Sequence, residues 1–508
     1  MKGLSKSRDS QFCQCPKALW LKIYKPELEE IDDSIQSRFE QGNEVGDLAM
    51  GLLGLYIDVT TYREDGSLDI SGMIEKTKQE IKKGTLNICE ASFSFIENGI
   101  SHYCAVDILH KEPTGWSIYE VKSSSYNNDK DDSANNLSAY IRDIVYQKWL
   151  LERIGINVTG TYLVRLDSNY IREGELDIHD LFHIKDMREL LVDEYGAVYD
   201  NISQIRKILT GVEPDMEVDS HCRSPYVCSF LKYCIGNIPE PNMFDLYLMR
   251  FSKKCDYYNQ GKIIFEDFRD EKLSEVQTMQ VESYLNKTEY IKPTEIKKFL
   301  NKLTFPLYFL DFETMQPAIP PFNKSKPYQQ IPFQYSLHWI EEDGELKHTE
   351  FLGNSMEDPR RELAVQLCNE IPANACVTAY NKAFECSRLN EMAEIFPDLR
   401  EHLLSISSNI VDLIEPFRGK MVYLSAMNGS FSIKKVLPAL FPDDPELNYK
   451  NLAGSVHNGS EAMSIYPAIA KMSKEDAEKA RKSLLEYCKL DTFAMVRIWE
   501  KLKEYADL

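Results

Sequence analysis

One dense cluster of helix- and strand-breaking residues lies near the middle of the chain, the segment 236–241 (GNIPEP). On both sides of it, short apolar runs alternate with amphipathic, helix-like stretches. This alternation is typical of α/β and α+β domains, and each side is long enough to form a domain. We therefore predict a multidomain α/β protein with a first module at 1–240, a helical connector at 241–302 and a second module at 303–508.

Composition limits the class of protein. The 508 residues include 80 acidic and 59 basic side chains, a formal net charge of -21, and 43% are hydrophobic. This apolar content excludes wholesale disorder, and the acidity argues against wholesale coating of nucleic acid while leaving local basic grooves and carboxylate-rich metal sites open. The segment 1–20 lacks an apolar signal sequence, and no nearby uncharged run is long enough to span a bilayer. We expect a cytoplasmic protein with no membrane partner.

In the first module, two strand-like runs at 101–109 and 116–121 flank a Pro-Thr-Gly turn. Residues two apart on a strand share a face, so Glu120 and Lys122 project together, and Asp107 lies on the partner strand. Two such carboxylates can hold Mg²⁺ or Mn²⁺, and a neighbouring lysine can orient a water and stabilise charge at a scissile phosphate. An exposed cross-strand ion pair is the alternative interpretation.

This stretch resembles the PD-(D/E)XK nuclease motif, and most closely its RecB branch. Asp107 matches the acid before the hairpin, and Glu120-Val121-Lys122 matches the E-x-K element. The resemblance implies a restriction-endonuclease-like core in which Asp107 and Glu120 bind a metal and Lys122 is catalytic.

Two flanking helices extend the resemblance. The upstream helix matches at Phe39, Gly42, Glu44, Val45 and Gly46. Glu44 would then be a metal ligand, with a helix-surface carboxylate as the alternative. On the later helix, Asp143 and Gln147 match, and Gln147 would bind substrate. Leu151 departs from the pattern, because RecB nucleases have a tyrosine four residues after the glutamine.

Twelve cysteines are too few for a disulfide scaffold. Five of them form two tight groups: Cys13, Cys15, Cys222, Cys228 and Cys234. The later three recur every six residues, which disfavours without excluding a structural zinc site, since zinc ribbons pair cysteines at shorter spacing. Unligated thiols in a loop-rich segment are the other interpretation.

The cysteine order is similar to that of RecB-like nucleases of the helicase-nuclease and CRISPR-associated kinds. These carry one cysteine before the nuclease core and three after it, which together hold an iron–sulfur cluster. The resemblance implies a [4Fe-4S] cluster bound by Cys15, Cys222, Cys228 and Cys234. Cys15, which precedes a proline, fits the upstream position better than Cys13. The cluster type stays open.

The second module begins with an apolar strand that delivers Asp311 and Glu313 to one face at its end. An Asp-x-Glu pattern alone is weak evidence for a functional site, because so acidic a chain would contain it by chance. We predict strands at 307–312, 334–340, 349–352 and 376–380, and helices at about 359–370, 383–396 and 474–502. A mixed sheet covered by helices is the expected fold.

Further carboxylates accompany this strand. Asn381 and Glu385 lie four residues apart at the start of a helix, and Tyr487 and Asp491 lie four apart on the terminal helix, hence on one face. Three separate elements thus each offer a carboxylate, with a phenol beside the last. This is the set that two-metal phosphoryl transfer requires.

The series resembles the DEDDy exonucleases of the RNase H-like fold, in the DnaQ proofreading and RNase D group. The resemblance makes Asp311, Glu313, Glu385 and Asp491 catalytic metal ligands, and Tyr487 a catalytic residue that helps to orient the attacking water. Glu385 departs from the family, which has the shorter aspartate there.

The same resemblance implies contacts with substrate. Asn381 and Lys434 would bind it, and Ser432, Lys434 and Lys435 resemble a basic helix start that holds the substrate backbone, with solvated lysines as the alternative. Asp412 fits a further acidic position, and a helix N-cap or surface role is equally open.

The co-occurrence of both patterns resembles a bacterial family that fuses a RecB-type nuclease to a DEDDy domain. We expect a metal-dependent nuclease that uses Mg²⁺ or Mn²⁺, favours DNA over RNA, and carries a [4Fe-4S] cluster. One alternative is a nucleic-acid-binding iron–sulfur scaffold with a single active nuclease domain. The other is an RNA-processing exonuclease.

Overall fold

The computed structural model describes residues 3–30, 33–128, 133, 136–192 and 195–508. The chain divides into two compact units: Met1–Asn237 with Pro317–Tyr328, and Ile238–Gln316 with Gln329–Leu508. The first boundary falls inside the breaker-rich segment 236–241. The segment 241–302, expected as a connector, lies within the second unit, and Pro317–Tyr328 lies with the first.

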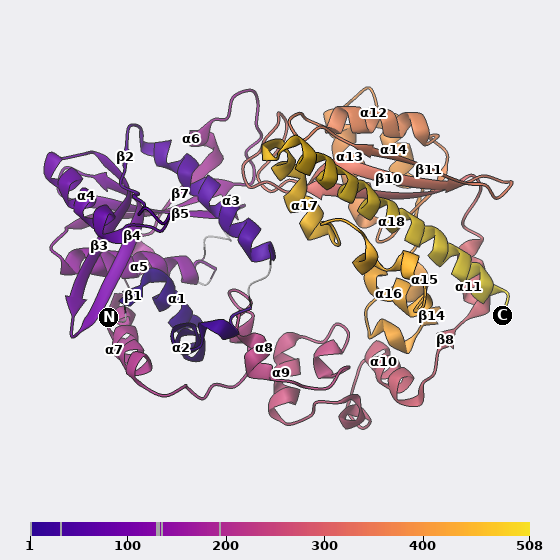
Figure 1. Ribbon diagram of the computed structural model, residues 1–508, viewed down its shortest axis with the longest axis horizontal. Helices are drawn as coiled ribbons and strands as arrows, with labels where there is room; N and C mark the ends of the chain where they lie inside the picture. The colour runs from indigo at the N-terminus through magenta and orange to yellow at the C-terminus, as the bar shows by residue number, and fades with distance from the viewer. Residues whose placement is uncertain (1–2, 31–32, 129–132, 134–135, 193–194) are drawn as a thin grey trace. The chain divides into compact units, whose positions relative to one another are not determined.

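A seven-stranded sheet forms the centre of the first unit, in the order β2-β3-β4-β5-β6-β7, with β1 paired to β4 (Figure 1). Its strands are β1 (Gly3–Ser5), β2 (Ile57–Asp58), β3 (Asn87–Glu97), β4 (Ile100–Lys111), β5 (Trp116–Tyr126), β6 (Val158–Asp167) and β7 (Phe182–Asp186). β4 and β5 are antiparallel, with Ile108 opposite Tyr119. The two predicted strands of this module are therefore confirmed, and both are longer than expected.

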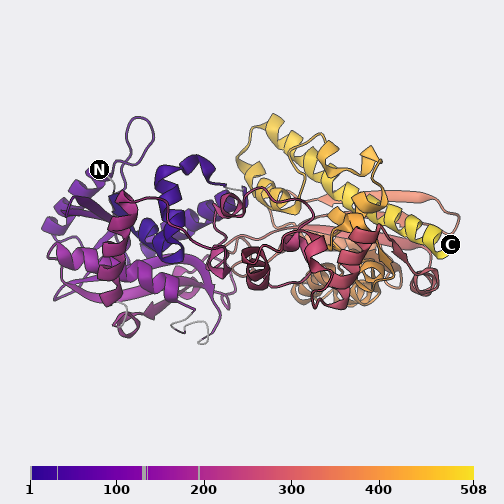
Figure 2. The ribbon, with the colours of Figure 1, turned by 90° about the horizontal axis from the view of Figure 1, so that it is seen from below.

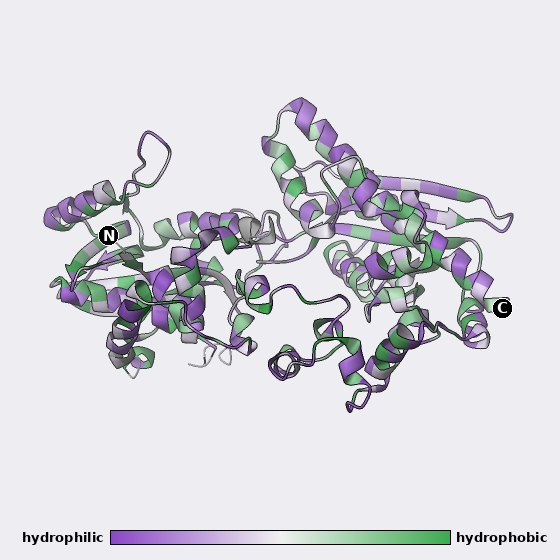
Figure 3. Ribbon diagram, turned by 60° about the horizontal axis from the view of Figure 1, so that its bottom comes forward, coloured by the Kyte–Doolittle hydropathy of each residue, from purple (hydrophilic) through white to green (hydrophobic). Residues whose placement is uncertain are grey.

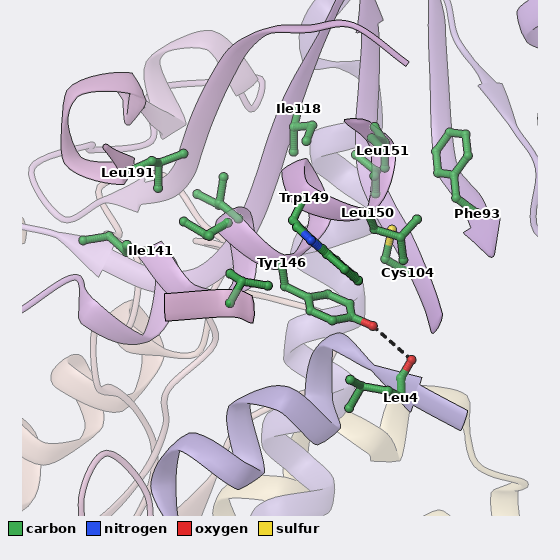
Figure 4. Packing of buried hydrophobic residues seen from close by; sticks show 14 of the residues in the cluster. Leu4, Phe93, Cys104, Ile118, Ile141, Tyr146, Trp149, Leu150, Leu151 and Leu191 are labelled. Atoms are coloured by element: carbon green, nitrogen blue, oxygen red, sulfur yellow. Dashed lines mark hydrogen bonds between the residues drawn. The ribbon is translucent and has the colours of Figure 1, made fainter. Parts of the chain in front are cut away.

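Helices surround this sheet. They are α1 (Lys6–Gln14), α2 (Pro16–Tyr24), α3 (Asp33–Ala49), α4 (Ile70–Lys83), α5 (Ser138–Arg153), α6 (Ile178–Leu181), α7 (Tyr195–Thr210) and α8 (Leu231–Ile235). α5 is the later helix that carries Asp143 and Gln147, and it buries Tyr146, Trp149 and Leu151 in the main core of the unit (Figure 4). The Tyr146 hydroxyl also donates a 3.0 Å hydrogen bond to the Leu4 carbonyl oxygen, which fixes the N-terminal strand to the core.

The second unit contains a five-stranded mixed sheet in the order β11-β10-β9-β12-β13. Its strands are β9 (Leu307–Met315), β10 (Ile331–Ile340), β11 (Leu346–Leu352), β12 (Cys376–Ala379) and β13 (Ile410–Asp412); β8 (Tyr290–Ile291) and β14 (Val422–Tyr423) pair separately. β9 pairs antiparallel with β10 and parallel with β12. The predicted mixed sheet is confirmed.

The helices of the second unit are α9 (Phe251–Asn259), α10 (Glu275–Asn286), α11 (Pro293–Leu300), α12 (Arg360–Glu370), α13 (Ala383–Ile395), α14 (Arg400–Ser408), α15 (Glu415–Arg418), α16 (Ile433–Leu440), α17 (Gly459–Ala468) and α18 (Lys474–Ala506). α18, yellow in Figure 2, packs against β9 and β10. Ser473 caps its N-terminus by accepting from the backbone N–H of Asp476. Helices in Figure 3 carry both hydrophobic and hydrophilic residues, as expected when one face is buried. Across the described ranges, we find no helix whose length and apolarity would let it cross a membrane.

Candidate functional site

The first candidate site lies on the neighbouring strands β4 and β5. The backbone N–H of Val121 donates a 2.6 Å hydrogen bond to Asp107 Oδ2, which holds that carboxylate beside β5. Glu120 and Lys122 follow on β5, and their side chains meet with 2.8 Å between Lys122 Nζ and Glu120 Oε1. The structure therefore brings together the three residues of the predicted nuclease motif.

Glu120 is fully buried and has three side-chain partners. Its Oε1 accepts from Lys6 Nζ at 2.7 Å and lies 2.8 Å from Lys122 Nζ, and its Oε2 accepts from Gln147 Nε2 at 2.6 Å. Burial alone would raise the pKa of Glu120, but the charges of Lys6 and Lys122 outweigh burial and lower the pKa to about 2. Glu120 is thus held as a carboxylate.

Lys122 also contacts Asp143 on α5. Its Nζ donates to Asp143 Oδ2 at 2.6 Å, and Asp143 Oδ1 accepts from Ser10 Oγ at 2.6 Å. Burial would lower the pKa of Lys122, but the charges of Glu120 and Asp143 raise it well above its usual value. The lysine therefore stays protonated and can act as a positive charge and hydrogen-bond donor.

A further carboxylate, Glu90, lies next to Asp107. It occupies an irregular position of β3 with a φ of 56°, in the left-handed region that non-glycine residues rarely adopt. Burial and then the charge of Asp107 raise the pKa of Glu90 to about 7. Burial and the charge of Glu120 likewise raise the pKa of Asp107 to about 6. The two acids together provide an oxygen-rich place for a hard cation.

The structure places the flanking residues of the RecB-like pattern differently, some in the site and some outside it. Gln147 lies in the site, where its amide contacts Glu120 and the Asp143 backbone oxygen at 3.2 Å. Glu44 is exposed on α3, and the structure does not place it in the hydrogen-bonded group around Glu120. Leu151 is fully buried in the main core of the unit, so its side chain packs against other apolar residues.

The second candidate site lies at the end of β9, beneath α18. Asp311 and Glu313 of β9 and Cys488 of α18 each offer a ligand atom within 4.8 Å of the others. Cys488 Sγ lies 3.7 Å from Asp311 Oδ2. Burial and then the charge of Asp491 raise the pKa of both Asp311 and Glu313 well above their usual values.

Two tyrosines and a lysine surround Asp491. The Tyr449 hydroxyl donates a 2.5 Å hydrogen bond to Asp491 Oδ1, and Tyr487 also hydrogen-bonds to this carboxylate. Lys434 Nζ lies 5.4 Å from the Tyr449 ring centroid and 5.2 Å from that of Tyr487, within cation–π range. Burial raises the pKa of Asp491 to about 6 despite these hydrogen bonds and the charge of Lys434.

Glu385, in the first turn of α13, completes the acidic group. It is 2% exposed, and its Oε2 has no hydrogen-bond partner among the described residues. Burial, with a contribution from the charge of Asp412, raises its pKa to about 8. The charge of Glu385 in turn raises the pKa of both Asp311 and Glu313. The predicted carboxylates therefore form one electrostatically connected group.

Asn381 and Asp412 have local roles in the structure. Asn381 adopts a φ of 70°, and its backbone N–H donates to Asp412 Oδ1 at 2.9 Å. The same oxygen accepts from the Ile414 N–H at 3.2 Å. Asp412 thus fixes two turns, while the exposed side chain of Asn381 contacts Arg418 rather than the acidic group.

Four cysteines of the first unit line one small cavity: Cys15, Cys222, Cys228 and Cys234. Phe230 and Leu21, both fully buried, pack beside them. Cys13 lies elsewhere, where its sulfur accepts from Asn201 Nδ2 at 3.3 Å and packs against the main core. Among the described residues, the cysteines form no disulfide bonds.

Sequence reasoning missed four residues that contact these sites: Lys6, Glu90, Tyr449 and Cys488. Lys6 and Tyr449 lie 114 and 42 positions from the acids that they contact, so no local spacing connects them. Cys488 could have been predicted from the sequence. It follows Tyr487 and lies three residues before Asp491 on the same helix, a spacing that puts two side chains on one face.

Comparisons with known proteins match parts of the chain. Residues 308–432 match the family described as a domain of unknown function (DUF2779). The uncharacterized protein UU173 of Ureaplasma parvum serovar 3 is 31% identical over 230 residues, which cover 41% of this chain and 32% of that protein. The uncharacterized protein MG366 homolog of Mycoplasma pneumoniae is 25% identical over 226 residues, which cover 42% of this chain and 34% of that protein. The matched parts span about a third of the length of these relatives.

Proposed function

We propose that the protein is a metal-dependent nuclease that hydrolyses phosphodiester bonds, preferably of DNA, at two sites. The observation that carries this proposal is the buried acidic group of the second site, to which β9, α13 and α18 each contribute. Mutual repulsion of buried carboxylates is relieved by divalent cations, and such a set suits two-metal phosphoryl transfer. Bound Mg²⁺ or Mn²⁺ would supply Lewis-acid stabilisation of the phosphate there.

In the second site, the roles follow from position. Asp311, Glu313, Glu385 and Asp491 would hold the ions. Tyr487, beside Asp491, would orient the attacking water, and Lys434 would attract the substrate backbone. The arrangement is similar to a DEDDy 3'–5' exonuclease in an RNase H-like core, with Glu385 in place of an aspartate.

In the first site, Asp107 and Glu120 would hold an ion, as in a RecB-like PD-(D/E)XK nuclease. Because neighbouring carboxylates keep Lys122 protonated, its role would be to orient water and to stabilise charge on the scissile phosphate rather than to accept a proton. Gln147 would fix the orientation of Glu120 through their 2.6 Å hydrogen bond.

The four thiols that line one cavity fit a [4Fe-4S] cluster by donor type and number. Thiolates that share one tetrahedral zinc would lie about 3.8 Å apart, given a Zn–S bond of about 2.3 Å. The proposal of a cluster rather than zinc rests on the order and spacing of the cysteines in the sequence. The bound group would join the start of α2 to the segment 222–234.

The proposal is tested with purified wild-type protein and end-labelled single- and double-stranded DNA and RNA. We expect cleavage of DNA with Mg²⁺ or Mn²⁺ and none after chelation. A preference for RNA would instead indicate an RNA-processing exonuclease. Absence of cleavage on all four substrates, with binding retained, would support the scaffold alternative and contradict the nuclease proposal.

A further inference from the structure

Lys6 reaches the first site from a position 114 residues before Glu120. β1 pairs parallel with β4, with Ser5 opposite Tyr103, and Ser5 then caps α1 by accepting from the Arg8 backbone N–H. Lys6 is the first residue of α1, and this anchoring directs its side chain to Glu120, 2.7 Å from Oε1.

Two ammonium groups therefore compete for one oxygen. Lys6 and Lys122 lie 2.7 Å and 2.8 Å from the same Glu120 Oε1, and their like charges repel each other. Lys122 is also held by Asp143 at 2.6 Å. The charges of Asp107 and Asp143 also act favourably on Lys6, so the site holds no excess of positive charge. Because Lys122 has a second ion pair, Lys6 is the ammonium that can leave Glu120 Oε1 more readily.

We propose that Lys6 is a second active-site lysine, which occupies Glu120 Oε1 when no divalent ion is bound and contacts the scissile phosphate once an ion has taken that oxygen. The inference rests on the proposed nuclease function of the first site. It accounts for the pairing of Lys6 with the oxygen that is proposed to bind the ion.

The physical basis is competition between cations. A divalent ion on Glu120 Oε1 would repel both ammonium groups that share this oxygen, and Lys6, which lacks the Asp143 ion pair that holds Lys122, is the one that we expect it to displace. The side chain of Lys6 is 24% exposed and carries a long flexible stem, so the ammonium can move towards a phosphate while α1 stays in place. Its place in the first turn of a nine-residue helix also favours an anion nearby.

The test uses Mn²⁺ titrations followed by electron paramagnetic resonance of the free ion, in an Asp311→Ala background that disables the second site. Lys6→Ala should bind Mn²⁺ several-fold more tightly, because the competing ammonium is gone. Single-turnover cleavage by the same variant at saturating Mn²⁺ should be slower by roughly tenfold or more, because a positive charge at the phosphate is lost.

Two further variants separate this role from a structural one. Lys6→Arg keeps the charge and should restore part of the cleavage rate. Lys76→Ala removes a lysine of the same unit that contacts the Asp58 carbonyl oxygen, and it should change neither Mn²⁺ affinity nor rate.

The outcomes are distinguishable. Weaker or unchanged Mn²⁺ binding in Lys6→Ala, with the cleavage rate of the parent protein, would overturn the inference alone. If the parent protein neither binds Mn²⁺ at the first site nor cleaves any substrate, the proposed function of that site fails, and the inference fails with it.

Discussion

Glu120 and Asp491 are both buried carboxylates, but their neighbours act on them in opposite directions. Two lysines keep the pKa of Glu120 near 2, whereas burial keeps the pKa of Asp491 near 6. Lysines therefore compensate the charge of Glu120 in the first site, whereas burial and mutual repulsion disfavour ionisation of Asp311 and Glu313 in the second. We infer that ion binding stabilises the second unit more strongly than the first.

The pH dependence of the stability of an Asp491→Asn variant tests whether ionised Asp491 destabilises the second unit. Because the folded-state pKa of Asp491 is raised from 3.8 to about 6, its contribution to stability falls as pH rises between those values and stays lost above them. In chelator near pH 8, the variant should therefore be more stable than wild type by about 1–3 kcal/mol. Denaturant unfolding measures this.

Two controls test this prediction, one by adding the ion and one by changing an exposed aspartate. Mn²⁺ should raise the melting temperature of wild type and have much less effect on Asp491→Asn. The exposed Asp443→Asn, in the same unit, should match wild type in both conditions. A variant less stable than wild type in chelator at every pH would show that Asp491 stabilises the ion-free fold.

Residue type and spacing made most acids of the two sites predictable, but not Glu90, and the predicted Glu44 is exposed on α3. Asp311 and Glu313 share a strand, and Tyr487 and Asp491 share a helix face, so local periodicity placed them correctly. The partners Lys6 and Tyr449 were not predictable, because only the tertiary fold brings them to Glu120 and Asp491.

At the scale of elements, periodicity predicted the paired strands β4 and β5, the mixed sheet of the second unit and the long helix α18. It did not predict β3, in which both faces are largely buried at the start so that alternation is lost. Nor could it predict that Pro317–Tyr328, which interrupts the second unit, lies with the first. There the Tyr328 hydroxyl donates to the Ser123 carbonyl oxygen, a contact that depends on tertiary structure.

The thiol-lined cavity joins segments about two hundred residues apart, so its loss should loosen the first unit. Cys228→Ser should remove the visible absorption expected of anaerobically purified protein, lower its iron content, and lower the melting temperature of the first unit by several degrees. Absorption spectra, metal analysis and calorimetry measure these effects.

Cys13→Ser is the matched control, because Cys13 is partly buried in the same unit but does not line the cavity. It should keep both iron and absorption. Stoichiometric zinc without iron in the anaerobic wild type, or equal losses in the two variants, would contradict a cluster held by the four thiols.

The whole molecule combines an overall charge of -21 with two sites that would both act on a polyanion. Long-range attraction would therefore not recruit nucleic acid, and the proposed binding would depend on local positive groups such as Lys6, Lys122 and Lys434. The matched family region, 308–432, includes Asp311, Glu313 and Glu385 but ends before Lys434 and α18. Each unit has its own core and its own candidate site, so we expect the two activities to be separable.

The most direct test of the two-site proposal is the pattern of products from 3'-blocked and 3'-free end-labelled DNA with Mn²⁺, compared between Lys122→Ala and Asp311→Ala. We predict that Asp311→Ala abolishes a ladder of single-nucleotide steps from the free 3' end and retains the other cleavage. Lys122→Ala should keep the ladder and reduce the other cleavage by roughly a hundredfold or more. A ladder that persists undiminished in Asp311→Ala but disappears in Lys122→Ala would place all cleavage in the first unit and contradict the proposal of two active sites.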